Sequence, residues 1–177
     1  MGEIVAAANC SVEAAAGGTW IVTKTGGANG AADSSAVSAA AMAGDFVLRA
    51  RLLGPGTAYV GVGANPLAAH DGASIERALQ ISGSIVRMFE SGAQRPPFFG
   101  LTGFAWLRRI GGTLEYGVGA DYASIVVKRS VAGVSGALRF DSSLLTSGLA
   151  VEVKFELPAA FLKAARRRPR LSLGLSI

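Results

Sequence analysis

The stretch from Phe104 to Ser130 places the strongest constraint on the fold. It holds three short apolar runs, Phe104–Ile110, Thr113–Val118 and Tyr122–Arg129, and each run ends at glycine or a polar turn. Short alternating runs separated by such turns are typical of consecutive antiparallel strands. We therefore predict a β-meander here, and the same pattern recurs along most of the chain.

Further strands are predicted on both sides of this meander. In Asp45–Leu53 the apolar residues alternate with Arg49 and Arg51, which fall on the opposite face of the strand. A Pro-Gly turn predicts that this strand forms a hairpin with Thr57–Gly63. The other predicted strands are Thr19–Thr25, Ser35–Met42, Ile75–Ser82, Ser84–Glu90, Ala137–Phe140 and Gly148–Leu157.

Two regions fit the strand pattern less directly. Gly92–Gly100 contains the adjacent prolines Pro96 and Pro97, which do not fit inside a central strand, so a loop is predicted. The short apolar segments Glu3–Asn9 and Ser11–Ala15 fit either a sandwich strand or an N-terminal arm. The sequence leaves these two alternatives open.

The chain of 177 residues is long enough to bury the core of one domain without disulfides or metals. Strands at intervals of about ten residues, with almost no helical periodicity, predict an all-β sandwich or barrel. We expect a body over residues 1–157 and a C-terminal arm over residues 158–177. In the arm, Pro158 and Ala159–Arg168 predict a short helix, and Arg170–Ile177 predicts a terminal strand.

The charge is concentrated in this arm. The chain has 17 basic and 12 acidic residues, and the arm holds five of the basic ones and none of the acidic ones, so the body is neutral. Only 16% of the residues are charged, which fits either a surface covered by identical subunits or the composition bias of a GC-rich genome. The basic residues of the arm are Lys163, Arg166, Arg167, Arg168 and Arg170.

The arm predicts a contact between subunits. Its strand places four aliphatic side chains on one face, and an exposed strand of this kind favours addition to the sheet of a neighbour. We therefore expect a homo-oligomer, with a trimer favoured. The residues expected to contact a partner or a shell are Arg166, Arg167, Arg168, Arg170, Leu171, Leu173, Leu175 and Ile177.

Several strand and turn motifs recur in the runs Arg87–Gly92, Trp106–Tyr116, Val126–Ser130 and Gly136–Asp141, with Asp45-Phe46-Val47 as an earlier strand. These runs resemble concanavalin A-like lectin/glucanase sandwich domains found in phage and bacterial surface proteins. The resemblance covers residues 18–156 and implies an antiparallel jelly-roll sandwich. Because its motifs are strand and turn patterns, it implies the fold rather than an activity.

No catalytic or metal-binding pattern accompanies these motifs. Glucanases of this fold carry alternating carboxylates on one strand, as in E-x-D-x-x-E, whereas the candidate carboxylates Glu76, Glu90, Glu115, Asp121 and Asp141 are isolated from one another. The His70-Asp71 pair has no G-x-S-x-G serine motif to complete a triad. We therefore expect a protein that is not an enzyme, with no metal and no cofactor.

The remaining sequence signals concern location and partners. The single cysteine, Cys10, excludes an internal disulfide, and the N-terminus lacks the basic segment of a secretion signal. No apolar run approaches the ~18 residues of a membrane-spanning helix. We therefore expect a virion protein made in the host cytoplasm, with no membrane partner.

Two functions fit best, and a third ranks last. The first is a structural subunit of a virus particle, such as a tailed-phage head decoration, spike or fibre, that contacts other virion proteins. It follows from the sandwich resemblance, the lack of a secretion signal and of a catalytic set, and the neutral body with its basic arm. The alternative is a carbohydrate-binding, lectin-like module whose glycan contacts would be Phe98, Phe99 and Tyr122. Nucleic-acid binding through the arginines of the arm ranks last, because no aromatic residues are interleaved with them to stack on bases.

Overall fold

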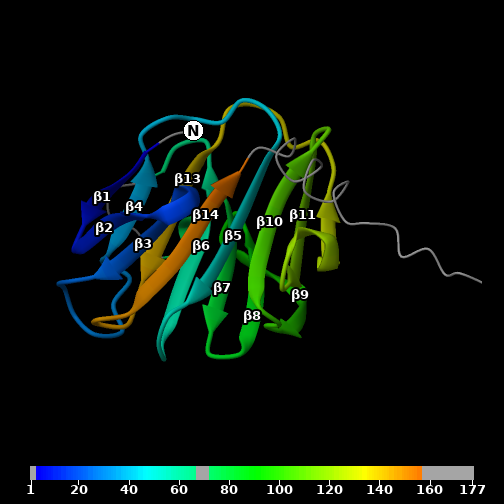
Figure 1. Ribbon diagram of the computed structural model, residues 1–177. Helices are drawn as coiled ribbons and strands as arrows, with labels where there is room; N and C mark the ends of the chain where they lie inside the picture. Colours follow the sequence, from blue (N-terminus) through cyan, green and yellow to red (C-terminus); the bar gives the residue numbers. More distant parts are fainter. Residues whose placement is uncertain (1–2, 67–71, 157–177) are drawn as a thin grey trace, which may run out of the picture.

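The computed structural model describes residues 3–66 and 72–156, which form two antiparallel sheets packed face to face (Figure 1). The predicted all-β sandwich is confirmed. The helix and strand expected in residues 158–177 lie outside the described residues, as do His70 and Asp71. No helix in the described part of the chain is long and apolar enough to cross a membrane.

The described residues form seven strands in each sheet. Across sheet A the order is β1 (Ile4–Ala8), β4 (Ser35–Ser38), β13 (Arg139–Leu144), β6 (Thr57–Gly63), β7 (Arg77–Ser82), β8 (Ile85–Glu90) and β9 (Ala93–Gly100). Across sheet B it is β12 (Val126–Val131), β11 (Thr113–Gly119), β10 (Phe104–Ile110), β5 (Phe46–Leu52), β14 (Ala150–Glu156), β3 (Thr19–Lys24) and β2 (Cys10–Ala15). Short 3-10 helices are Ala16–Gly18 (η1), Gly72–Ser74 (η2) and Tyr122–Ser124 (η3).

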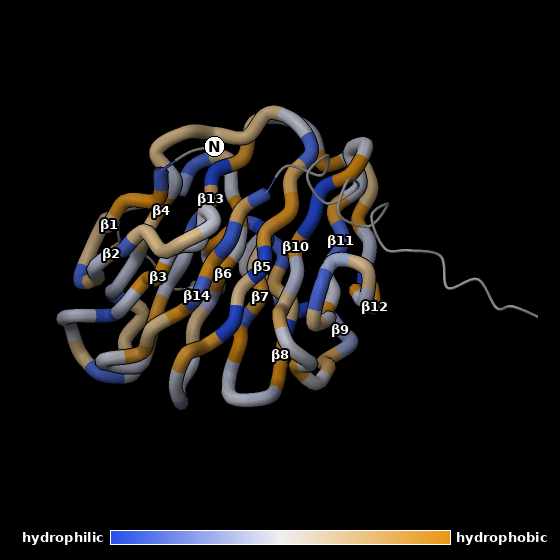
Figure 2. The backbone as a smooth tube through the Cα atoms, in the orientation of Figure 1, coloured by the Kyte–Doolittle hydropathy of each residue, from blue (hydrophilic) through white to orange (hydrophobic). Residues whose placement is uncertain are grey.

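The core lies between the sheets and is built from alternate residues of each strand. Phe46, Leu48 and Ala50 of β5 are at most 1% exposed and belong to this core, as the alternation in the sequence predicts. In Figure 2 the same alternation appears as apolar and polar segments along the strands. The outer face of sheet B is thereby left to the intervening residues, among them Arg49 and Arg51.

The predicted meander is present as β10, β11 and β12, which pair in order. The third strand begins at Val126 rather than Tyr122, because η3 intervenes. Asp121 caps η3 by accepting a hydrogen bond from the Ser124 backbone N–H at 2.9 Å. The N-terminal segments are strands rather than an arm, since β1 and β2 form edges of the two sheets and are separated by Asn9 in a left-handed conformation (φ 45°).

The hairpin predicted for residues 45–63 is wrong, although both of its strands exist. β5 pairs with β10 and β14 in sheet B, whereas β6 pairs with β13 and β7 in sheet A. The turn at Pro55-Gly56 therefore carries the chain from one sheet to the other. Both strands are central and have partners on both sides. Both partners of β5 come from distant parts of the sequence, whereas β6 lies between the distant β13 and the next strand, β7.

The loop predicted for residues 92–100 is also wrong, because this segment forms β9. β9 is the last strand of sheet A and pairs only with β8 among the described strands. A proline lacks the backbone N–H that a central strand needs, but an edge strand tolerates this loss on its open side. The pairing register shifts between Val86 and Met88, opposite the two prolines.

Candidate functional surfaces

The outer face of sheet B carries a row of three aromatic rings. Phe104 and Trp106 of β10 alternate with the core residues Ala105 and Leu107, so they point away from the core. The ring centroids of Phe104 and Trp106 lie 6.2 Å apart, and those of Trp106 and Tyr122 lie 6.3 Å apart, both with edge-to-face geometry. This geometry is favourable for aromatic pairs and fixes the row in place.

Arginines pack against these rings. The Arg49 Cζ lies 4.4 Å from the Phe104 centroid and 5.9 Å from that of Trp106. Arg51 lies 4.9 Å from Phe104, and Arg108 lies 5.2 Å from Tyr122. We name this surface the arginine–aromatic face and define it by Arg49, Arg51, Phe104, Trp106, Arg108 and Tyr122.

The arginines differ in their acidic partners. Arg51 forms an ion pair with Glu152 at 2.6 Å, and Arg108 forms one with Glu115 at 2.5 Å. Arg49 has no such carboxylate among the described residues, and its buried Nε–H has no acceptor there. A buried donor without an acceptor costs roughly 1–3 kcal/mol, so the stacking on Phe104 must hold this side chain in place.

A second surface is the open edge formed by β9 and β12, which lie against each other. Among the strands of residues 3–66 and 72–156, each is the last strand of its sheet. β12 exposes Val126 and Val127, which are 53% and 37% exposed, and β9 exposes Phe98, which is 55% exposed. The Arg87 guanidinium lies 5.8 Å from the Phe98 ring centroid. The exposed side chains of this edge are therefore mixed, since polar residues such as Lys128 of β12 and Arg95 of β9 lie among the apolar ones.

An ion pair joins the two sheets beneath this edge. Glu90 of β8 accepts hydrogen bonds from Arg129 of β12 at 2.7 and 2.8 Å, and Arg95 of β9 lies 3.3 Å away. The Arg129 guanidinium holds the pKa of Glu90 below its usual range, despite the opposing effect of burial. The nearby Tyr116 hydroxyl is buried, and burial raises its pKa. The Glu90–Arg129 ion pair therefore links sheet A to sheet B.

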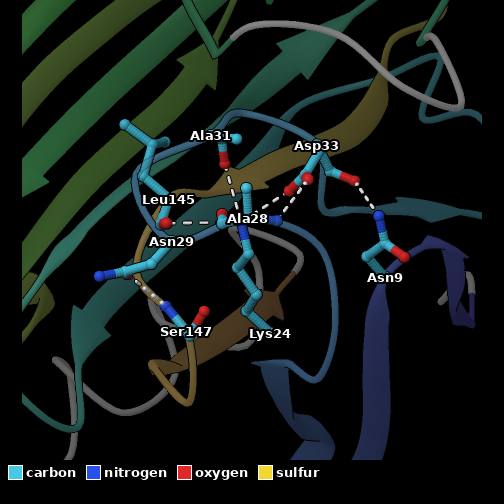
Figure 3. Close-up of polar contacts among 8 residues, drawn as sticks. All are labelled: Asn9, Lys24, Ala28, Asn29, Ala31, Asp33, Leu145 and Ser147. Carbon is cyan, nitrogen blue, oxygen red and sulfur yellow. Dashed lines mark hydrogen bonds and ion pairs between the residues drawn. The ribbon is translucent and has the colours of Figure 1, made fainter.

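A buried lysine organises the loop over residues 25–34 (Figure 3). Lys24 of β3 is 1% exposed. Its Nζ donates hydrogen bonds to the carboxylate of Asp33 (2.6 Å) and to the backbone carbonyls of Ala28 (2.9 Å), Ala31 (2.8 Å) and Leu145 (3.4 Å). The Lys24 ammonium lowers the pKa of Asp33. The shell of oxygens resembles that of a bound cation, and its role is structural.

A small pocket of about 180 Å³, with polar and apolar lining, lies beside β6 and β13. Glu76 is tied to its wall, since its carboxylate accepts a hydrogen bond from the Ala64 N–H at 3.1 Å. The volume of the pocket suits a few water molecules rather than a sugar chain. The lining residues are Gly63, Ala64, Asn65, Ser74, Ile75, Glu76 and Asp141. Within residues 3–66 and 72–156, no three His, Cys, Asp or Glu side chains are grouped to hold a metal ion.

The structure does not bring the three glycan candidates together. Phe98 lies on the outer side of sheet A, and Tyr122 packs on the outer side of sheet B. Phe99 is only 9% exposed and belongs to the core, so it is poorly placed for a glycan. The eight candidates in the arm lie outside the described residues.

Sequence reasoning did not identify the arginine–aromatic face, although its signal was present. Phe104, Trp106 and Arg108 are spaced by two residues, as are Arg49 and Arg51, so each set shares one strand face. The pairing of β5 with β10 places these two sets side by side. That pairing joins residues more than 50 positions apart, and no local pattern predicts it.

Comparisons with known proteins identify the fold but no family. Neither a protein-family model nor a characterised protein matches the chain. The PSpry domain of TRIM65 has a TM-score of 0.56 and 13% identity, with 82% of this chain and 91% of that chain covered. The SPRY domain of human HERC1 has a TM-score of 0.55 and 14% identity, with the same coverage of 82% and 91%. At such identities the likeness shows a shared sandwich fold alone.

The expected lectin/glucanase class therefore remains a prediction. A more distant likeness is to the CBM2 module of the evolved Dit of Lactobacillus casei BL23 phage J-1. Its TM-score is 0.42 at 11% identity, with 82% of this chain and 76% of that chain covered. A likeness of this degree carries no argument about the role of this chain.

Proposed function

We propose that the chain is a non-enzymatic structural subunit of a virus particle, namely a tailed-phage head decoration, spike or fibre. The observation that carries the assembly part of this proposal is the open edge of β12, with Val126 and Val127 exposed. An open edge with apolar side chains invites pairing with another chain, and native proteins cover or blunt such edges. A neighbouring subunit would provide that cover.

The arm supplies the matching strand in this proposal. Residues 170–177 alternate between aliphatic and small or polar residues, as an added strand requires. Burying the four aliphatic side chains would contribute on the order of 6–10 kcal/mol before entropy costs. We infer that Leu171–Ile177 of one subunit pairs with β12 of the next, and that the arginines of the arm contact the neighbour or the shell.

The native mass, measured by light scattering, tests the assembly. The full chain is expected to form a discrete oligomer, whereas a chain ending at Glu156 and the variant Val127→Lys are expected to be monomeric. Val5→Lys is the matched control, because Val5 lies on the edge strand β1 and is 36% exposed, against 37% for Val127. A monomeric full chain, or a truncated chain that still assembles, contradicts the proposal.

The particle assignment needs a separate measurement. Peptides of this chain are expected in purified virions of the virus that encodes it, in stoichiometric rather than trace amounts. Quantitative mass spectrometry of washed particles makes this measurement. Absence from the particle contradicts a virion role and leaves the assembly result unaffected.

A carbohydrate-binding module is the second candidate. The observation that favours it is Phe98, an exposed aromatic ring beside Arg87 at one edge of the sandwich. Exposed rings of this kind can stack on the apolar face of a sugar. A glycan screen with the Phe98→Ala variant tests the module, and binding that is absent, or unaffected by the variant, contradicts a Phe98 site. Phe99→Ala is unsuitable because it removes a core side chain.

A further inference from the structure

Among the three arginines of the arginine–aromatic face, Arg49 alone forms no ion pair with a carboxylate of the described residues. Arg51 and Arg108 are neutralised by Glu152 and Glu115, respectively. On the strands beside β5, the residues directly opposite Arg49 are Trp106 and Lys154, and neither is acidic. Within residues 3–66 and 72–156, Arg49 therefore has an uncompensated positive charge.

The Arg49 side chain is also held in one orientation. Its guanidinium packs on the Phe104 ring at 4.4 Å and near the Trp106 ring at 5.9 Å. Its Nε is buried, while the residue as a whole is partly exposed. A preordered fork of two N–H donors matches the two oxygens of a carboxylate and loses little entropy on binding.

The neighbouring charges restrict what kind of anion can bind. The carboxylates of Glu152 and Glu115 lie on the same outer face as Arg49 and are fixed there by ion pairs with Arg51 and Arg108, respectively. These carboxylates repel a second anionic group placed close to the first. They also accept hydrogen bonds from hydroxyl groups. The surface thus suits one carboxylate surrounded by hydroxyls, and disfavours dense polyanions such as nucleic acid or sulfated polymers.

We propose that Arg49 is the carboxylate-binding centre of a site for an acidic glycan with widely spaced carboxylates, on the outer face of sheet B. This inference rests on the second candidate function and names a site and a ligand class for it. The site is distinct from Phe98, which lies on sheet A. The sugar carboxylate binds the Nη groups of Arg49, and its neighbouring hydroxyls bind the charged side chains around them.

Binding of hyaluronan oligosaccharides to the full chain, measured by calorimetry, tests the proposal. This polymer carries one carboxylate per disaccharide, and neutral dextran, heparin and polyglutamate are the comparison probes. Arg49→Gln is expected to weaken hyaluronan binding roughly 10- to 100-fold, because a charge-assisted pair is lost. Arg49→Lys should bind with intermediate strength, since it keeps the charge but loses the fork.

Two controls make the result specific. Arg87→Gln removes the arginine beside Phe98 on sheet A and is expected to leave hyaluronan binding unchanged, as is Phe98→Ala. Equal losses in Arg49→Gln and Arg87→Gln would overturn the proposal in favour of unspecific charge attraction. No hyaluronan binding, or tighter Arg49-dependent binding of heparin or polyglutamate, would also overturn it. Loss of binding in Phe98→Ala alone would support the module but place its site on sheet A.

Discussion

At the residue scale, Lys24 shows how a single charge can build a loop. Its ammonium is enclosed by one carboxylate and three carbonyl oxygens that come from residues 28–33 and from Leu145. Burying a charge is costly unless it is paired and hydrogen-bonded, and here both conditions are met. The conformation of the loop therefore requires the Lys24 ammonium, and the burial of this ammonium requires the oxygens of the loop.

Lys24→Met is expected to destabilise the protein by roughly 2–4 kcal/mol, because the oxygens of the shell lose their shared donor. Urea unfolding at neutral pH measures the difference. Lys128→Met is the control, since Lys128 is exposed on β12 and should change stability by less than about 0.5 kcal/mol. Equal stabilities of the two variants would contradict a structural role for the ammonium.

The sequence could not predict this shell. Lys24 appears at the end of an alternating strand next to a polar loop, a position where lysines are usually solvated. Its burial depends on Leu145, which is 121 positions away and brings the fourth oxygen. Tyr116, in contrast, lies in the core between the sheets, whereas Trp106 points to the outer face of sheet B and is nevertheless 0% exposed.

At the scale of the element, Gly61 fixes how closely β6 and β7 approach. A Cβ atom at this position would lie 2.0 Å from the Arg77 carbonyl oxygen and 2.8 Å from the Ala78 Cα. Both atoms belong to the backbone of the neighbouring strand, which cannot move without breaking the pairing of Gly61 with Ala78. The strand pair therefore needs glycine here.

Gly61→Ala is expected to cost at least about 1–3 kcal/mol, or to prevent folding, because the added methyl group overpacks the sheet. Gly54→Ala is the matched control, since no atom lies within 4 Å of a Cβ built there. Thermal unfolding followed by circular dichroism compares the two variants. Similar melting temperatures for both would contradict the close approach of the strands.

The individual strands could be predicted more reliably than their partners. Alternation located the two strands before and after Pro55 because burial on one face leaves a period of two in the sequence. The same pattern says nothing about which sheet a strand joins, so the predicted hairpin failed. β9 was missed for a different reason, since the proline rule applies to central strands and the edge position was unknown.

At the scale of the whole molecule, the Glu90–Arg129 pair links the sheets and makes their association depend on pH. Arg129 lowers the pKa of Glu90 in the folded state. The stabilising contribution is therefore complete above the unfolded pKa of about 4.3 and is lost as the pH falls through the lower folded value. Acid should loosen the β9–β12 edge of the sandwich first.

Glu90→Gln is expected to lower the free energy of unfolding at pH 7, and its difference from the unmodified protein is expected to be smaller at pH 3, because protonation of Glu90 removes the charge that Arg129 pairs with. Urea unfolding at the two pH values, at one protein concentration, measures this change. Glu13→Gln on the exposed strand β2 is the control. Its unfolding free energy should change between pH 7 and pH 3 by the same amount as that of the unmodified protein. If Glu90→Gln and the unmodified chain lost the same unfolding free energy between pH 7 and pH 3, the ion pair would not contribute to the pH dependence of stability.

The tethered ammonium in the loop over residues 25–34 has a practical consequence. Many extracellular and surface domains hold comparable loops with calcium, which diffuses away when the surroundings are depleted of it. A lysine side chain is covalently attached, so dilution and chelating agents cannot extract it. This corner of the sandwich should keep its shape in citrate or EDTA, and through any passage between ion-rich and ion-poor media.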